Sequence, residues 1–376
     1  MNTSKLQLLF DHYIRDFERI NDDKNDETYK WAVVQGFQDG FDLQASDFAG
    51  MLYPVWRLSE NLIDNARQLP FWALVEYARS DPETVREMFA ALYQDDGGDL
   101  IQRQQKIDAF IAKSEELRSK YRPDSWRYVN DQRSVMTYLF LHDPDHNYLY
   151  KSTQAHEFAD CVEFYDDWGS GVNFKLEVYY RMCDQLVAEM RANPALIKTN
   201  ASRYEGDKRR LYCDDQLHIL AFDMIYSSQV YGLYGGIDYG HLDSKEKRLY
   251  IERAEKANRL QAVYDECAKQ QEHLVAVREY LHSVIVPGII ITHKLFGNGV
   301  VEASDGDYLV IRFDRSGELK RFGFLSALAG GYIVPTSSDI NQYIMENVEI
   351  MKADSSIPAK LKSAEAVLAP YLEFLS

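Results

Sequence analysis

The stretch from Ile289 to Ile333 constrains the fold most, because it interrupts a sequence whose apolar residues otherwise recur at helical spacing. Three turn signals separate its short β-patterned runs: Gly297-Asn298-Gly299, Asp305-Gly306-Asp307 and Arg315-Ser316-Gly317. Such glycine-containing signals are typical of tight turns. From Leu309 to Phe313, apolar residues occupy every second position, as a half-buried strand requires. We expect a small all-β module here, of a kind that usually binds something and seldom catalyses a reaction.

The rest of the chain predicts a mainly α-helical protein. Apolar residues at steps of three and four indicate helices over most of the first 120 residues, and again beyond residue 153. A run with eight Lys or Arg and eight Asp or Glu predicts one long, charge-mixed helix. The expected organisation is a helical region at 1–125, an α+β region at 126–235, the long helix at 243–286, the β module at 289–334 and a helical tail at 338–376.

An embedded β-hairpin is expected at residues 133–151. Val135 to Leu141 is a continuous apolar run that suits a strand, the turn-forming residues 143–147 follow, and Tyr148 to Lys151 resumes the pattern. Alternation would place Tyr148 and Tyr150 on one face.

Composition restricts the partners and the compartment. The 376 residues carry a net charge of -17, with nine Lys or Arg against nineteen Asp or Glu in the first hundred residues, so nucleic-acid binding would need a local basic patch. Four widely spaced cysteines indicate neither a zinc site nor a disulfide framework. The charged N-terminus does not resemble a signal peptide, and no apolar run is long enough to cross a membrane. We expect a cytoplasmic protein without a bound cofactor or metal.

The sequence contains no strong catalytic motif. A P-loop, an HExxH zinc motif and a GxSxG nucleophile elbow are all missing. The nearest approach to an Mg²⁺-dependent nuclease site is Asp166 and Asp167 upstream of Lys175. The i,i+4 pair of Asp214 and His218 suits acid–base chemistry, but a structural hydrogen bond is the commoner role of such a pair.

Two groups of residues are candidates for binding nucleic acid or a protein partner, since aromatic rings stack on bases and cations contact phosphates. A Tyr-rich segment packed on helices is the alternative for the first group, and a neutral balance of five cations and five acids weakens phosphate binding by the second. The candidates are Arg133, Tyr138, Tyr150 and Lys151 in the expected hairpin, and Lys294, Arg312, Lys320 and Arg321 in the β module.

Several short runs in the first part of the chain carry a family resemblance: Gln132-Arg133-Ser134-Val135, Asp143-Pro144-Asp145, Tyr148-Leu149-Tyr150-Lys151, Tyr180-Arg181-Met182-Cys183-Asp184 and Leu217-His218-Ile219-Leu220. Together with pieces around Trp31 and at 81–89, the segment through Tyr231 resembles the region that precedes the ATPase in McrB-type (methylcytosine-dependent restriction) AAA+ proteins of bacteria. The ATPase itself does not follow here. The resemblance implies recognition of DNA or of a modified base.

The run His293-Lys294-Leu295-Phe296-Gly297-Asn298-Gly299-Val300 opens the β module. It resembles the HxxFGxGxV opening of the Tudor-like, SH3-type barrel at the C-terminus of UvrD/PcrA-type helicases. That resemblance implies an SH3/Tudor-like barrel used for docking or for association with nucleic acid, although a shared fold does not transfer a function.

The expected fold is therefore mainly α with an embedded β-hairpin, plus a small all-β SH3/Tudor-like barrel near the C-terminus. The expected function is non-enzymatic: binding of DNA, plain or modified, or of a DNA-bound partner in bacterial DNA metabolism, restriction-modification or antiviral defence. A protein–protein adaptor and an Mg²⁺-dependent nuclease remain the alternatives. Expected partners are DNA and a separate motor or nuclease subunit, with no membrane, and the long helix is a candidate for oligomerisation.

Overall fold

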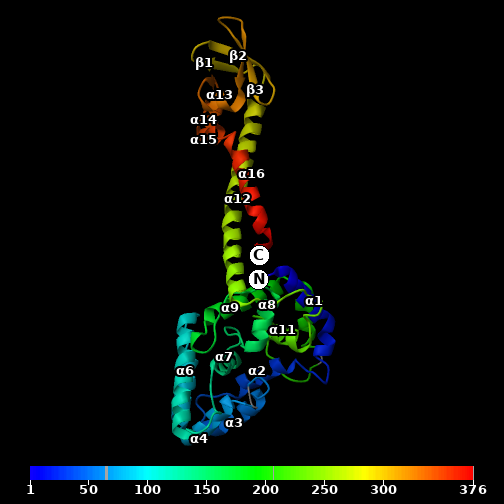
Figure 1. Cartoon of the computed structure of the whole chain (residues 1–376), viewed down its shortest axis with the longest axis vertical. Helices are drawn as coiled ribbons and strands as arrows, with labels where there is room; N and C mark the ends of the chain where they lie inside the picture. The colour runs from blue at the N-terminus through cyan, green and yellow to red at the C-terminus, as the bar shows by residue number, and fades with distance from the viewer. Residues whose placement is uncertain (64–66, 206, 376) are drawn as a thin grey trace. The chain divides into compact units, whose positions relative to one another are not determined.

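The computed structural model describes residues 1–63, 67–205 and 207–375 (Figure 1). The described chain forms two compact units, one from Met1 to Arg248 and one from Leu249 to Leu375. The mainly α class with a small β domain is confirmed, since the structure is 61% helical and has one five-stranded antiparallel sheet near the C-terminus.

The first unit is built from helices. They are α1 (Thr3–Ile20), α2 (Tyr29–Gly40), α3 (Phe48–Ser59), α4 (Pro70–Ser80), α5 (Pro82–Leu92), α6 (Leu100–Tyr121), α7 (Gln132–His142), α8 (Ser152–Cys161), α9 (Leu176–Arg191), α10 (Pro194–Ser202) and α11 (His218–Val230), with a 3₁₀ turn η1 (Gly171–Asn173).

Local sequence signals explain where several of these helices begin. The side chain of Asn2 accepts a hydrogen bond from the backbone N–H of Lys5 at 3.1 Å and so caps α1. Asp131 and Ser134 form a reciprocal capping box at the start of α7. Pro82 opens α5 at the first helical position, where its missing N–H costs nothing.

One continuous apolar core holds the first unit together. It runs in sequence from Leu6 to Ile237 and draws on every α-helix from α1 to α11. Its largest fully buried side chains include Trp31, Tyr77 and Tyr138. Residues 1–125 and 126–235 therefore contribute to the same core.

The expected hairpin at 133–151 is wrong. Residues Gln132–His142 form helix α7, and the following residues reach α8 as a turn and an extended segment that pairs with no strand. All eight residues from Ser134 to Leu141 are buried. A helix that is buried on every side has no polar face, so its sequence lacks the helical period and reads like a buried strand.

The second unit begins within α12 (Ser244–Val284), which confirms the predicted long helix. The strands that follow are β1 (Ile290–His293), β2 (Gly297–Ser304), β3 (Tyr308–Phe313), β4 (Leu319–Gly323) and β5 (Ile333–Pro335). They form one antiparallel sheet in the order β4-β3-β2-β1-β5, curled into a half-barrel. We call residues 289–335 the β module.

Two of the three turns of the β module lie where the sequence predicts them, and the first turn lies a few residues earlier than predicted. Gly306 and Gly317 have positive φ and lie in the second and third predicted turns. The first turn consists of residues 294–296, and Gly297 to Gly299 already belong to β2. A Cβ at Gly299 would lie 2.7 Å from the backbone oxygen of Arg312, so close pairing with β3 requires a glycine there.

Helices complete the second unit. They are α13 (Phe324–Ala329), α14 (Ser338–Glu346), α15 (Val348–Lys352) and α16 (Ser356–Leu368), followed by the 3₁₀ segment η2 (Ala369–Phe374). A second core joins the inner side chains of the sheet, such as Ile311 and Phe313, to Leu281 of α12 and Ile357 of α16. In the part of the chain that the structure describes, no helix combines the length and the apolar character that a membrane crossing needs.

Candidate functional site

The four candidates from the expected hairpin do not form an exposed binding face. Tyr138 is fully buried and donates a hydrogen bond to Asn130 at 2.8 Å. Tyr150 is also buried, and its hydroxyl accepts from the indole N–H of Trp168 at 3.1 Å. Buried rings cannot stack on bases, so the predicted aromatic readout is wrong.

The two cations of that group have protein partners. Arg133 lies at the start of α7 and pairs with Asp131 at 2.5 Å. The ammonium group of Lys151 donates to the backbone oxygen of Leu62. Lys151 therefore ties the segment before α8 to residue 62, whereas Arg133 makes a local ion pair at the start of α7.

Of the four candidate cations in the β module, Lys320 is half-buried and the others are exposed, and three of the four are paired with acids. Arg312 pairs with Glu302 at 2.8 Å, Lys320 with Glu318 at 3.1 Å and Arg321 with Asp305 at 2.8 Å. Lys294 lies exposed in the turn between β1 and β2. A phosphate backbone would have to compete with these carboxylates, so the module offers little net positive charge.

The residues of the nuclease alternative are engaged in local structure. Asp166 pairs with Arg181 at 2.6 Å, and Asp167 accepts the backbone N–H of Gly169 at 2.8 Å in a turn. Lys175 is exposed immediately before α9. Across the described ranges, no three His, Cys, Asp or Glu side chains are grouped so that they could hold a metal ion.

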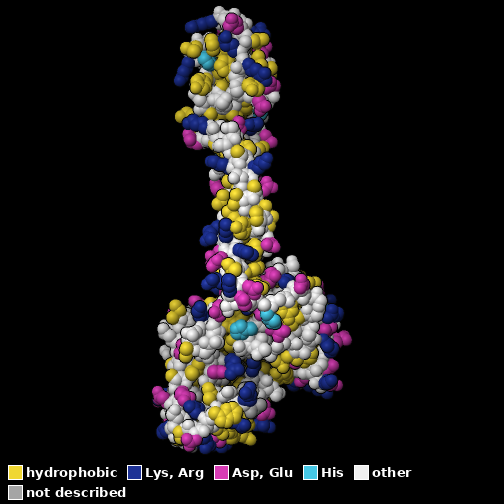
Figure 2. Space-filling model, in the orientation of Figure 1, with side chains coloured by type: hydrophobic (Ala, Val, Ile, Leu, Met, Phe, Trp, Pro, Cys, Tyr) yellow, Lys and Arg dark blue, Asp and Glu magenta, His cyan; other side chains and the backbone are white. Residues whose placement is uncertain are grey.

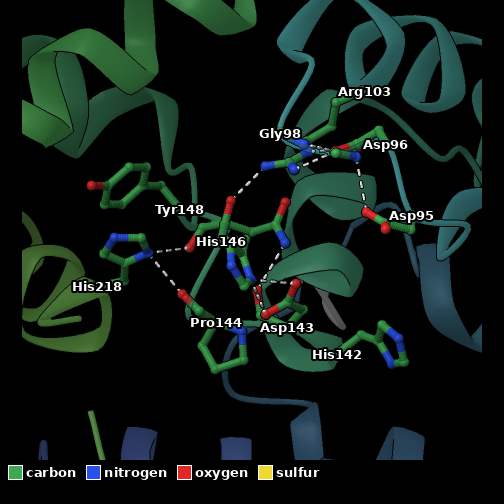
Figure 3. A network of polar contacts seen from close by, with 12 residues as sticks. Asp95, Asp96, Gly98, Arg103, His142, Asp143, Pro144, His146, Tyr148 and His218 are labelled. Carbon is green, nitrogen blue, oxygen red and sulfur yellow. Dashed lines mark hydrogen bonds and ion pairs between the residues drawn. The ribbon is translucent and has the colours of Figure 1, made fainter. Parts of the chain in front are cut away.

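A polar network connects the turn after α7 to α6 and α11 (Figure 3). Arg103 of α6 pairs with Asp96 at 2.6 Å and donates to the backbone oxygen of His146 at 2.5 Å. Burial opposes ionisation of Asp96, but Arg103 and Lys106 outweigh it and hold the pKa of that carboxyl well below its usual range. This half of the network therefore anchors the turn by a partly buried ion pair.

The other half of the network centres on His218. Its Nδ1 donates to the carbonyl oxygens of Pro144 at 2.7 Å and Asn147 at 3.2 Å, which fixes the proton on Nδ1 when the ring is neutral. The imidazole packs at a tilt against the ring of Tyr148, with the two ring centroids 4.0 Å apart (Figure 3). The hydroxyl of Tyr148 donates to the carboxylate of Asp184 at 2.8 Å. Burial lowers the pKa of His218. The imidazole thus serves as a structural hydrogen-bond donor that joins α11 to the turn after α7.

Asp214 does not form the predicted side-chain pair with His218. Its buried carboxylate accepts the backbone N–H groups of Ile219 at 3.1 Å and Leu220 at 2.9 Å, and so caps the first turn of α11. Burial raises the pKa of Asp214 to about 7, against the opposing effect of those backbone donors. The two side chains therefore serve separate structural roles: Asp214 binds backbone N–H groups of α11, and His218 binds backbone oxygens of the turn after α7.

A second polar network lies inside the first unit, where α1, α2 and α11 meet the end of α10. Asp223 accepts from Lys30 and Tyr13, and it lies 3.3 Å from Arg203. Lys30 also pairs with Glu27 at 2.8 Å. Burial opposes ionisation of Asp223, but the two cations keep the pKa of its carboxyl below the usual value.

Arg203 closes this second network. Its guanidinium stacks on Trp31, with Cζ 3.9 Å from the ring centroid, and donates to Asn21 at 2.5 Å and Thr28 at 2.9 Å. Two buried cations thus face two buried carboxylates. A groove of about 740 Å³ borders this network, but Asp26 on its wall is held by Arg209 at 2.7 Å. The network is a balanced structural element.

Among the described residues, the outer face of the curled sheet presents an exposed apolar row. Cross-strand pairing aligns Ile290, Val300, Arg312 and Leu319 in one row across four strands. Ile290 is 49% exposed and Leu319 is 60% exposed. Successive residues of a strand point to opposite faces, so Tyr308, Val310, Arg321 and Val334 lie on the same face as this row. We define the outer face as Ile290, Val300, Tyr308, Val310, Arg312, Leu319, Arg321 and Val334.

The composition of the outer face suits a protein interface. Arg321 stacks on the ring of Tyr308 at 3.8 Å, and Arg and Tyr are the residue types enriched at the energetic centres of interfaces. In Figure 2, apolar side chains reach the surface of the β module beside Lys and Arg. Contiguous exposed apolar side chains on a folded surface mark interaction sites.

Sequence reasoning identified the cations of this face but missed its apolar members. A signal was present: in β3, Tyr308 and Val310 alternate with the buried Leu309 and Ile311, so both faces of the strand carry apolar side chains. A sheet with one solvated face usually alternates apolar with polar residues.

Comparison with known proteins gave no match to this chain, whether with family models, curated proteins or solved structures.

Proposed function

We propose that this protein is a non-enzymatic binding protein, an adaptor that docks a protein partner through the outer face of its β module. One observation carries the proposal: on that face Ile290, Tyr308, Leu319 and Val334 are exposed and Val300 and Val310 are half-buried, while Arg312 and Arg321 are each paired with an acid. Burial of apolar surface drives protein association, and paired arginines add orientation without strong net charge.

The test compares two variants of the full chain. Ile290→Asp combined with Leu319→Asp places charge on the outer face, whereas Leu295→Asp changes a side chain that is 79% exposed in the β1–β2 turn. Affinity capture from a nuclease-treated lysate should retain a partner on the wild type and on Leu295→Asp, also at high salt. The double variant should lose it. Equal retention on all three proteins would contradict docking through this face.

A second candidate retains the context that the two sequence resemblances imply. In it the chain is a cytoplasmic bacterial protein of DNA metabolism or antiviral defence that contacts DNA directly. It is supported by those resemblances and by exposed cations such as Lys294. Fluorescence anisotropy with plain and methylated duplexes at low salt separates the two candidates. If the Ile290→Asp, Leu319→Asp variant still binds the duplexes, and that binding weakens steeply as salt is raised, the result would favour direct DNA contact over docking of a protein on the outer face.

A further inference from the structure

In the second unit, α12 from residue 249 onward runs antiparallel to α16 and η2, as Figure 1 shows. The rings of Tyr250 and Phe374 lie 5.4 Å apart, and Lys256 donates to the hydroxyl of Tyr371 at 2.7 Å. Further along, Arg278 pairs with Asp354 at 2.6 Å. We call residues 249–284 and 356–374 the helix pair.

Two helices alone bury only the side chains between them, and this pair leaves apolar residues outside that seam. Ala257 in the seam is fully buried, but Val263 is 54% exposed and Val367 is 49% exposed. The seven residues from Ala366 to Leu372 are all apolar, and within them only Leu368 is buried.

Two of the exposed valines, Val263 and Val367, lie on one side of the pair, beside the half-buried Leu260 and Cys267. Leu260, Val263 and Cys267 follow one another at steps of three and four, which places them along one stripe of α12 beside the seam. Antiparallel packing with helical spacing brings Val367 of α16 to the same side. Figure 2 shows apolar side chains gathered over the middle of the pair.

Charge identifies the occupant of this side. The whole chain carries -17, so two copies repel over most of their surfaces. Residues 249–284 and 356–375 hold seven Lys or Arg against eight Asp or Glu, which makes the helix pair nearly neutral. Two copies can therefore approach along the helix pair without that repulsion.

The available area is sufficient. Residues 249–284 of α12 extend over about 54 Å at a rise of about 1.5 Å per residue. A strip about 15 Å wide along this segment covers roughly 800 Å², which is the area that each partner buries in a standard stable interface. We propose that two copies of this chain associate through the side of the helix pair that carries Val263 and Val367, so that two helix pairs form a four-helix bundle. This inference is independent of the outer face of the β module.

Analytical ultracentrifugation of the full chain over a wide concentration range tests the inference. The wild type should sediment at twice the chain mass of 43.6 kDa. Val263→Glu combined with Val367→Glu should raise the dissociation constant at least tenfold, while Met345→Glu, at a residue 76% exposed on α14, should leave it unchanged.

Hydrogen exchange on the wild type keeps the inference testable if the double variant fails to fold. Amides of residues 260–267 and 363–368 should gain protection as concentration rises. A wild type that stays at 43.6 kDa at every concentration overturns the inference. So does a dimer that survives the double variant but dissociates in Leu319→Asp, because that result would place the interface on the sheet.

Discussion

The two units differ in where their charged side chains lie. Of the residues that the structure describes, every buried Lys, Arg, Asp and Glu belongs to the first unit, including Lys30, Arg103 and Asp223. Both units leave some apolar side chains exposed, such as Val172 in the first unit and Leu319 in the second, but in the sheet of the second unit they form a row across neighbouring strands.

Buried ion pairs and exposed apolar rows have different effects on folding and on binding. A buried, paired charge fixes the position of the elements around it but offers nothing to a partner, whereas an exposed apolar row adds little to folding and gains free energy when it is covered. Under the two proposals above, the first unit serves as a scaffold and the second unit carries the surfaces for association.

The largest expected effect comes from breaking the buried ion network of the first unit. Asp223→Ala leaves Lys30 and Arg203 without their shared carboxylate and should lower the free energy of unfolding by about 3–5 kcal/mol. Urea unfolding measures it. Asp16→Ala removes a surface pair with Arg19 and should cost only about 0.2–1 kcal/mol. Equal effects of the two substitutions would remove the contrast between buried and exposed charge.

Asp214 predicts the pH dependence of the same unit. Its folded-state pKa is raised from 3.8 to about 7, so the unfolded chain loses this proton first. Stability should therefore fall as the pH rises from 4 to 7, by up to about 4 kcal/mol from this group. Asp214→Asn should flatten that slope in urea unfolding measured from pH 4 to 8. An unchanged slope would show that the carboxylate is not responsible.

The independence of the two units predicts a local effect in the sheet. Ile311→Val removes one methylene from the core of the second unit and should lower its stability by about 1 kcal/mol. Amide hydrogen exchange should show faster opening in the β module and no change in α7 or α11. Faster exchange in those helices would mean that the two units unfold together.

The smallest expected effect concerns the paired cations of the outer face. Arg312→Ala should change the free energy of unfolding by about 0.2–1 kcal/mol, since its ion pair with Glu302 is exposed and screened by solvent. A double-mutant cycle with Glu302→Ala measures the coupling directly. A coupling of several kcal/mol would mean that this pair behaves like the buried pairs of the first unit.

The sequence predicted elements where local chemistry decides them. The sequence predicts the long charge-mixed helix at 243–286, and the structure has it at Ser244–Val284. The β module was located from its turns and its alternation. The prediction from sequence failed at α7, where burial on all sides removes the periodicity that distinguishes a helix from a strand.

The candidate site was harder to predict because residue type does not report what a side chain contacts. Tyr150 and Lys151 have the chemistry of a nucleic-acid site, yet the structure buries the ring and directs the ammonium group to a backbone oxygen. The acids that neutralise Arg312 and Arg321 lie ten and sixteen residues upstream in the chain. Only the sheet register and the β2–β3 turn bring these charges together.

The balanced charges around Asp223 also restrict how this sequence can diverge. Because Glu27, Lys30, Arg203 and Asp223 depend on one another, replacing any one leaves an opposite charge stranded in the interior. We expect homologues to retain the four residues together or to have exchanged all of them for apolar side chains, with few surviving intermediates.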